Sequence, residues 1–478
     1  MFGYGFKMPP QPRKTALFDA EEWYQNLLAE KLGIPYSPIQ RSNFGQYHMA
    51  VHYLTSVMEE AKAIEKVAVY NIDHMAQINF RGKDACALLD RVLPANVESM
   101  KIGQCKYTLL LNDNGGVLDD LIIMKRAEDS FILVINAGHD LSDEQHGLIS
   151  DTDFIMQHLH PDDEVFVEDL SDQLVKVDVQ GPYSYKLITE IFGSDVLKNR
   201  NDKGKNMSYF TFNEVILPYS HDFTTQFIND QSDGHNNLLP IGQTYFFSRT
   251  GYTNRWGWEI YIPQLHAIEK FKQIVLKAME YGGLLVGLGG RDDNRLSAGN
   301  VGLPLMGKEY NSVNTPTNVP LFHTAVDLQK PDFVGKQQLL KDIEIGLDQR
   351  MVIIISEGNV INNDVYINGV RQGTVTSCIM SPNVPLEKRL FIGSERKSVN
   401  EENGIAAIAL AWLNHSPYQK DEHQVDIITI DEKPIRIPVE LYRVKEGQPV
   451  GNPVLGYISA DGVNPPTAAK PLKNIEQY

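Results

Sequence analysis

The sequence predicts an α+β protein that ends in a separate all-β domain. Its 478 residues are too many for one ordinary hydrophobic core and indicate roughly two to four domains. Helical and strand-like segments alternate up to about Lys341, and only short strand-like segments separated by turns follow. The chain length and this change of pattern together predict the fold class.

The composition favours a small-molecule ligand. The chain has 44 Lys and Arg residues against 61 Asp and Glu residues, and the net charge of -17 opposes binding to nucleic acid or to an anionic membrane. The N-terminal residues lack the apolar core of a signal peptide, and no apolar run has membrane-spanning length. The three cysteines match neither a disulfide framework nor a zinc site. These features predict a cytoplasmic protein.

The first expected elements are a helix and a strand that follow each other directly. The segment Ser56-Val57-Met58-Glu59 has the form of a capping box and begins the helix. The strand covers residues 67–72. A second strand at residues 78–80 and a helix from about residue 84 to residue 92 come next.

A hairpin with two adjacent acidic residues is the first candidate for a site. Residues 107–111 and 117–123 are strand-like, and the Asn- and Gly-rich turn between them predicts a hairpin. Side chains alternate along a strand, so Asp119 and Asp120 point to opposite faces, and both faces are rich in apolar residues. A carboxylate in such surroundings tends to have a raised pKa, which suits it to exchange a proton or to bind a cationic amine. The alternative is a solvated pair at a strand end or a helix N-cap.

The later elements alternate with polar loops. Residues 131–135 form a buried type of strand, and the loops at residues 199–206 and 228–237 predict surface insertions. A helix is expected over residues 265–281, where apolar side chains repeat with helical period: Leu265, Ile268, Phe271, Val275 and Met279. The strands of the all-β domain, with a charged loop at residues 394–404 among them, are expected at residues 351–355, 365–370, 406–413 and 424–430.

Two further segments carry candidate site residues. The run Gly287-Leu288-Gly289-Gly290 lacks the third glycine of a dinucleotide loop and the Lys-Ser/Thr pair of a P-loop. It remains a glycine-rich approach that frees Arg291 to enter a site, and the alternative is a solvated arginine at a helix start. Glu259 lies in a strand of aromatic and β-branched residues, where a buried glutamate needs a donor partner.

The sequence gives no support for a metal site or for nucleophilic catalysis. His158 and His160 have no third ligand at a plausible spacing, so no metal site is predicted. No Ser/His/Asp or Cys/His arrangement indicates nucleophilic catalysis.

Taken together and in order, these segments resemble the T protein of the glycine cleavage system. The matching motifs are Asn112-Asp113-Asn114-Gly115-Gly116-Val117-Leu118-Asp119-Asp120, Val134-Ile135-Asn136-Ala137, Val179-Gln180-Gly181-Pro182, Arg249-Thr250-Gly251-Tyr252-Thr253, Gly287-Leu288-Gly289-Gly290-Arg291-Asp292 and Phe333-Val334-Gly335-Lys336. That family contains tetrahydrofolate-dependent aminomethyltransferases and related demethylases. The resemblance implies three modules around a central folate channel: two interleaved α+β modules, which form the catalytic region (47–345), and a C-terminal β-barrel (346–478). An N-terminal extension (1–46) precedes them.

The resemblance also implies roles for single residues. Asp120 is similar to the family's essential aspartate beside the folate, and Glu259 to the acid that binds the pterin. A carboxylate can accept both parallel N–H donors of the pterin edge. The other implied folate contacts are two rings that pack on the folate, two channel-lining residues and a nearby arginine: Tyr107, Tyr252, Met75, Asn136 and Arg291. Whether this arginine or desolvation decides the charge of Asp120 stays open at this point.

The donor side departs from the family pattern. The family's usual residues are replaced around Tyr47, at Asp73 and at residues 254–257, and the bulk of Tyr47 and Trp256 would suit a closed donor pocket. The first hypothesis is therefore a transferase that moves a methyl group from a small methylated donor to N5 of tetrahydrofolate. One alternative is an aminomethyltransferase that receives its one-carbon unit from the lipoyl arm of a carrier protein. The other is a non-catalytic folate-binding protein, against which the retention of Asp120 argues.

Overall fold

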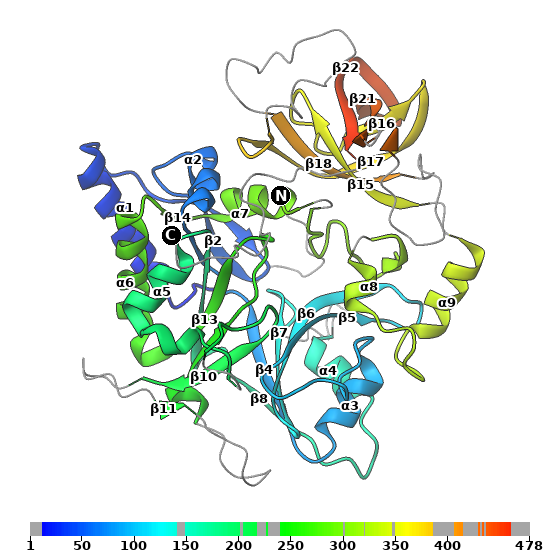
Figure 1. Ribbon diagram of the computed structural model, residues 1–478. Coiled ribbons are helices and arrows are strands. Elements are labelled where there is room, and N and C mark those ends of the chain that lie inside the picture. Colours follow the sequence, from blue (N-terminus) through cyan, green and yellow to red (C-terminus); the bar gives the residue numbers. More distant parts are fainter. Residues whose placement is uncertain are drawn as a thin grey trace.

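The computed structural model describes residues 12–140, 149–200, 204–217, 226–227, 240–299, 302–319, 321–346, 349–385, 406–413, 429–430, 433–434 and 436–459. Two sheets and a closed barrel organise this part of the chain (Figure 1). The predicted charged loop at residues 394–404 and the predicted polar loop at residues 228–237 lie outside the described residues. Among the described residues, no helix combines the length and the hydropathy that a membrane span requires.

The five-stranded antiparallel sheet contains the predicted hairpin. Its strands, in order, are β5 (Cys105–Leu111), β6 (Val117–Ala127), β7 (Ser130–Ile135), β4 (Ala76–Arg81) and β8 (Phe166–Asp169). The side-chain oxygen of Asn112 accepts the backbone N–H groups of Asn114 and Gly116, both at 3.0 Å, and so closes the turn. Gly115 has a φ of 73°, which only a few residue types adopt without strain. Helices α3 (Ala85–Val92) and α4 (Asp151–Met156) pack on one face of this sheet (Figure 1).

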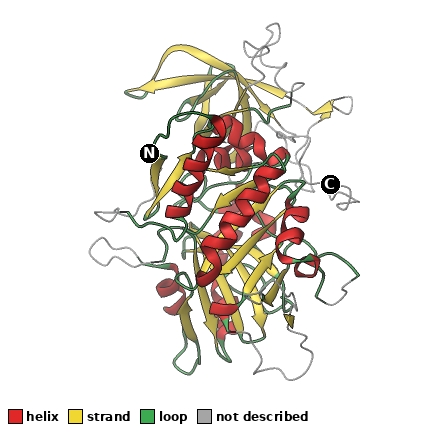
Figure 2. Ribbon diagram, turned by 90° about the vertical axis from the view of Figure 1, so that its left-hand side faces the viewer, coloured by secondary structure: helices red, strands yellow, loops and turns green. Residues whose placement is uncertain are grey.

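The seven-stranded sheet interleaves with the first one along the sequence. Its strands, in order, are β11 (Gln226–Phe227), β10 (Phe212–Ile216), β12 (Tyr245–Ser248), β13 (Gly257–Pro263), β9 (Leu174–Gln180), β3 (Ala68–Asn71) and β14 (Leu284–Val286). Helices α1 (Phe18–Leu32), α5 (Ser184–Phe192) and α6 (Ala267–Glu280) cover one face, which Figure 2 turns toward the viewer. Short 3-10 turns complete this region: η3 (Ser194–Leu197), η4 (Ile241–Gln243) and η5 (Gln264–His266).

Several local predictions are confirmed in this region. Ser56 caps α2 (Val57–Lys62) through a capping box, because its hydroxyl accepts the Glu59 backbone N–H and the Glu59 carboxylate accepts the Ser56 N–H. The 3-10 turn η1 (Ala63–Glu65) then leads into β3, as expected.

The predicted helix at residues 265–281 exists, but the expected apolar face is partly wrong. The chain forms η5 before α6 begins at Ala267, and this leaves Leu265 and Ile268 exposed at 79% and 40%. The buried stripe consists of Ala267, Phe271, Ile274, Val275 and Ala278, at helical spacing.

The N-terminal segment is part of this core. No helix or strand was predicted before residue 56. The structure contains α1 there, and a two-stranded sheet of β1 (Gln40–Phe44) and β2 (Tyr47–His52). Tyr24 and Leu28 of α1 are buried in the same apolar cluster as Val177 and Val179 of β9.

The C-terminal all-β domain is confirmed as a closed barrel. Its strands, in order, are β15 (Arg350–Ser356), β18 (Ala406–Leu413), β17 (Val370–Ser381), β16 (Asp364–Ile367), β21 (Arg436–Lys445) and β22 (Gln448–Ser459), and β22 pairs with β15. A two-stranded ribbon is formed by β19 (Thr429–Ile430) and β20 (Lys433–Pro434). The segment between the sheets and the barrel carries η6 (Pro316–Asn318), α8 (Phe322–Ala325) and α9 (Lys336–Ile345).

Helix α7 (Leu288–Leu296) lies between β17 and β18 of the barrel on one side and, on the other, β2 of the two-stranded sheet and β14 of the seven-stranded sheet (Figure 1). Its buried Arg295 forms an ion pair with Glu309 at 3.2 Å and donates to the Ser377 hydroxyl of β17 at 2.7 Å. Glu309 in turn accepts from Ser377 at 2.7 Å. This buried network fixes α7, which carries the predicted site residue Arg291.

Candidate functional site

A cavity of about 320 Å³ lies between the two sheets and α7. Every site residue predicted from the sequence lines this cavity: Met75, Tyr107, Asp120, Asn136, Tyr252, Glu259 and Arg291. One wall comes from β5, β6 and β7 of the five-stranded sheet, and the facing wall comes from β9 and β13 of the seven-stranded sheet. The fold thus brings together residues that are up to about 200 positions apart in the sequence.

Asp120 projects into the cavity from β6, as the alternation rule predicts. The Tyr107 hydroxyl donates to Oδ2 of Asp120 at 3.2 Å, and the Asn136 amide donates to Oδ1 at 2.8 Å. Burial, followed by the charge of Asp119, raises the pKa of Asp120 to about 7, although these two hydrogen bonds oppose the change. Burial therefore decides the question left open by the sequence, and the cation that lowers this pKa is His139 rather than Arg291.

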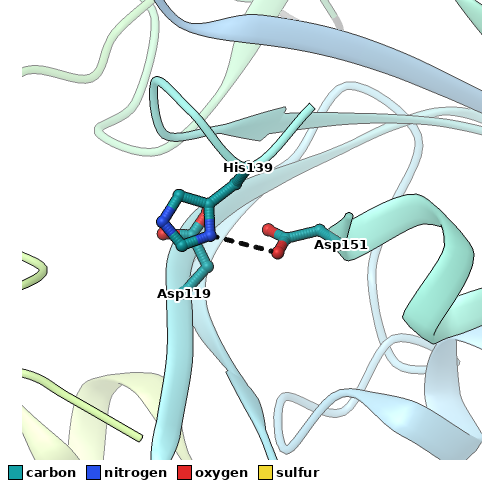
Figure 3. Close-up of side chains that lie close together, drawn as sticks. All are labelled: Asp119, His139 and Asp151. Atoms are coloured by element: carbon teal, nitrogen blue, oxygen red, sulfur yellow. Dashed lines mark hydrogen bonds and ion pairs between the residues drawn. The ribbon is translucent and has the colours of Figure 1, made fainter. Parts of the chain in front are cut away.

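Asp119 lies on the opposite face of β6, in a buried cluster with His139 and Asp151 (Figure 3). His139 follows β7, and its Nδ1 lies 3.3 Å from Oδ1 of Asp151, the first residue of α4. Burial favours the neutral imidazole, but the carboxylates of Asp119 and Asp151 outweigh it and raise the pKa of His139 to about 9. Burial also raises the pKa of Asp119, and the positive charge of His139 opposes that change.

This cluster is the one group among the described residues with the composition of a metal site, and its ligand atoms lie within 4.8 Å of one another. Asn136 already donates to both carboxylate oxygens of Asp119, through its backbone N–H at 3.0 Å and its amide at 2.8 Å. His139 already pairs with Asp151. We therefore interpret the cluster as a charge-balancing group behind Asp120.

Glu259 lies on the facing wall, in β13. From the sequence we expected a hydrogen-bond donor beside this buried acid, and the structure contains two. The Thr250 hydroxyl donates to Oε2 at 2.9 Å, and the Lys176 ammonium lies 3.2 Å from the same oxygen. Glu259 also pairs in register with Asp178 of β9, so two buried carboxylates stand side by side on adjacent strands. Burial, together with the charge of Glu259, raises the pKa of Asp178.

Tyr252 and Arg291 form a third side of the cavity. The guanidinium carbon of Arg291 lies 5.2 Å from the centre of the Tyr252 ring, and the Tyr252 hydroxyl donates to the Pro304 carbonyl. The glycine run before Arg291 forms the start of α7 instead of a separate loop. A Cβ on Gly287 would lie 2.4 Å from the Val51 carbonyl oxygen, so the glycine allows α7 to approach β2 closely.

The chain is similar in sequence to known proteins. Residues 40–221 match the family described as the GCVT N-terminal domain. An aminomethyltransferase of Thermoanaerobacter sp. (strain X514) is 28% identical over 374 residues, which cover 77% of this chain and 86% of the relative. An aminomethyltransferase of Pseudothermotoga lettingae is 29% identical over 405 residues, covering 84% of this chain and 93% of the relative.

A solved structure extends the match to the whole fold. The crystal structure of the glycine cleavage system aminomethyltransferase T from Bartonella henselae aligns with a TM-score of 0.63 at 20% identity, over 93% of this chain and 96% of that one. These matches support assignment of the chain to the T-protein superfamily. The mixed sheets and the C-terminal barrel are the fold of that superfamily.

The prediction that Tyr47 and Trp256 close a donor pocket does not agree with their positions in the structure. Neither Tyr47 nor Trp256 lines the cavity. Trp256 packs outside it, where the guanidinium carbon of Arg249 lies 4.2 Å from the centre of its ring. Tyr47 packs behind Phe44, and Phe44 itself reaches the cavity. Phe44 and Tyr47 are paired across the short β1–β2 turn, and Phe44 occupies the cavity side of this pair.

The sequence interpretation also missed several lining residues. They are mostly apolar or aromatic, apart from one lysine and one threonine: Phe44, Lys176, Tyr209, Phe210, Thr250, Leu303 and Leu305. The apolar members carried no signal that separates them from ordinary core residues. Lys176 did carry one, because Lys176, Asp178 and Gln180 share one face of a buried strand whose other face is entirely valine.

Proposed function

We propose that this protein transfers a methyl group from a small methylated donor to N5 of tetrahydrofolate. The observation that carries the proposal is the single cavity with Asp120 on one wall and Glu259 on the other, at the positions that the T-protein resemblance implies. The cytoplasmic location and the lack of nucleic acid or membrane partners remain predictions from the sequence.

The residues of the cavity fit a folate. Glu259 is a buried acceptor for the N–H donors of a pterin edge, and its Oε1 makes no hydrogen bond to any described residue. Tyr107, Tyr252 and Met75 supply aromatic and thioether surface along the cavity for the rings. Tetrahydrofolate would supply N5 as the nucleophile in this site.

Asp120 has the properties of the group that handles charge near the transferred carbon. Its pKa of about 7 means that it exchanges a proton readily at neutral pH. As a carboxylate it would balance the positive charge of a sulfonium or ammonium donor, or accept the proton that N5 loses. Tyr107 and Asn136 hold its two oxygens in place. Holding N5 against the methyl carbon would supply proximity, which can lower a barrier by roughly 7–11 kcal/mol in favourable cases.

The apolar lining favours a small methylated donor. Phe44, Leu303 and Leu305 would surround a methyl group without unpaired polar atoms. The second candidate is aminomethyl transfer with a lipoyl carrier protein as partner. The names of the relatives favour it, because the relatives given above are aminomethyltransferases.

Mass spectrometry of the folate product separates these candidates. The protein is incubated with tetrahydrofolate and a panel of sulfonium, methylamine and aryl methyl ether donors. We expect 5-methyl-tetrahydrofolate with one donor class, and its absence with Asp120→Asn. Formation of 5,10-methylene-tetrahydrofolate from an aminomethyl-loaded lipoyl carrier would support the second candidate instead. Binding of tetrahydrofolate without any product would indicate a non-catalytic folate-binding protein.

A further inference from the structure

Lys176 is a buried cation inside the cavity that the proposed reaction does not use. Its side chain is 1% exposed, and it lines the cavity from β9 beside Glu259. A lysine is rarely buried to this extent because desolvation of the ammonium costs several kcal/mol unless partners replace the lost water. Its position therefore calls for a specific role.

The ammonium has more donors than the surrounding protein uses. Of its three N–H groups, one faces Oε2 of Glu259 at 3.2 Å and another approaches the Met75 sulfur at 3.7 Å, which is a weak acceptor. The ammonium nitrogen also lies 5.2 Å from the centre of the Tyr261 ring, but among the described residues no oxygen accepts from the third N–H group. Asp178 is the next residue on the same face of β9, but it does not accept from Lys176: its Oδ1 accepts from Gln180 at 2.7 Å, and its buried Oδ2 makes no hydrogen bond to a described residue. A donor without a protein acceptor at a cavity wall indicates an acceptor on the ligand.

The order of polar atoms on this wall matches the edge of a pterin. The pterin presents the 2-amino group, N3–H and the O4 carbonyl in a row, which is the pattern donor, donor, acceptor. The wall presents Oε1 of Glu259, Oε2 of Glu259 and the ammonium of Lys176, which is the complementary pattern acceptor, acceptor, donor. The 3.2 Å between Oε2 and the ammonium nitrogen suits two adjacent, parallel hydrogen bonds to one ring edge.

We infer that Lys176 donates a hydrogen bond to O4 of the bound pterin and makes the site specific for 4-oxo over 4-amino pteridines. The inference rests on the proposed folate function. Lys176 would recognise the 4-oxo substituent, whereas Glu259 would accept hydrogen bonds from the 2-amino group and N3–H. A 4-amino-4-deoxy folate would direct an N–H donor at the ammonium, and two donors cannot pair. It would also lack the N3–H that Glu259 accepts, so Glu259 and Lys176 would share the discrimination.

The test measures dissociation constants of tetrahydrofolate and of 4-amino-4-deoxy-tetrahydrofolate for the full chain. The proteins compared are the wild type, Lys176→Met, which keeps the length of the side chain, and Lys101→Met as a matched control at an exposed lysine. We expect the wild type and Lys101→Met to bind the 4-oxo compound at least about tenfold more tightly. Lys176→Met should lose about 10- to 100-fold in affinity for tetrahydrofolate, as expected for a hydrogen bond from a charged group. Its preference for the 4-oxo compound should become clearly smaller than that of the wild type, and the part that remains would come from Glu259.

The possible results distinguish a failure of the role of Lys176 from a failure of the folate function. Unchanged tetrahydrofolate affinity and an unchanged preference in Lys176→Met would overturn the role of Lys176 and leave the folate function standing. A wild type that prefers the 4-amino compound would overturn the role of Lys176, even if Lys176→Met fails to fold. A wild type that binds neither compound would overturn the folate function itself.

Discussion

Asp119 and Asp120 point to opposite faces of β6, yet both accept a hydrogen bond at 2.8 Å from the same amide nitrogen of Asn136. The strand register predicted from the sequence is therefore right, and the two carboxylates are nevertheless linked. Asp120 faces the cavity, whereas Asp119 faces His139 and Asp151. Removing either charge should affect the other carboxylate. We expect the loss of Asp120 to lower turnover and the loss of Asp119 to lower stability.

The first prediction compares Asp120→Asn with Asp119→Asn. Asp120→Asn should lower turnover by at least about 100-fold, within the usual range for a proton-handling group, because the amide is isosteric but cannot carry charge. Its tetrahydrofolate affinity should stay within about tenfold. Asp119→Asn should mainly lower the free energy of unfolding, by about 1–3 kcal/mol, because it leaves His139 beside one carboxylate fewer.

Turnover, folate affinity and urea unfolding of both variants, measured with one folate preparation, check this prediction. Equal losses of turnover would mean that the two carboxylates act as one unit through Asn136. A larger loss of turnover in Asp119→Asn would contradict the assignment of Asp120.

The second prediction concerns the pH dependence of turnover. If Asp120 acts as a carboxylate, kcat/KM should rise with pH through about 7, the raised pKa of this group. Tyr107→Phe removes a hydrogen bond that lowers this pKa. The midpoint should therefore move upward by about one pH unit, since 1.36 kcal/mol corresponds to one pKa unit.

Steady-state pH profiles of the wild type, Tyr107→Phe and Tyr366→Phe in the barrel provide the comparison. The barrel variant should keep the wild-type midpoint. A midpoint that stays in place in Tyr107→Phe, or moves to lower pH, would rule out Asp120 as the titrating group.

The third prediction concerns His139 and stability. Its pKa is raised from 6.5 to about 9, so the folded state binds its proton more tightly than the unfolded state does. The resulting stabilisation is fully present below about pH 6.5 and is lost as the pH rises through about 9. His139→Gln should therefore lower the melting temperature most at pH 6, and the difference from the wild type should shrink by pH 9.5.

Thermal melts across this pH range, with exposed His160→Gln as the control, test the sign. A destabilisation by His139→Gln that grows with pH would show that the buried imidazole is neutral in the folded protein.

Much of this site was predictable because its signals are local. The turn closed by Asn112, the cap at Ser56 and the alternation at Asp119 and Asp120 each depend on residues only a few positions apart. The resemblance then placed Glu259 and Arg291 in one cavity with Asp120, which spacing alone could not do.

The parts that the sequence did not predict depend on distant contacts. Helix α1 has a weak apolar stripe of its own, and its Tyr24 and Leu28 are buried only because β9 and α6 provide a surface. The pairing of His139 with Asp151 joins a loop to a helix start. The pairing of Lys176 with Glu259 requires β9 and β13 to be neighbours, which is a property of the sheet order and not of either strand.

The fourth prediction concerns Glu259→Gln. The amide places a donor against the pterin's donors and also removes the carboxylate beside Lys176. Tetrahydrofolate affinity should fall by on the order of 1–3 kcal/mol, while the exposed control Glu269→Gln on α6 should bind normally. Isothermal titration of the three proteins decides it, and normal binding by Glu259→Gln would mean that this acid does not hold the pterin.

The most direct test of the central claim is the free energy of unfolding with and without tetrahydrofolate. A ligand that binds only the folded protein adds about 2.7 kcal/mol when its concentration reaches ~100 times the dissociation constant. We expect this gain for the wild type in urea titrations under reducing conditions. An unfolding midpoint that does not move at any tetrahydrofolate concentration, while a known folate-binding protein responds under the same conditions, would contradict the assignment of the cavity as a folate site.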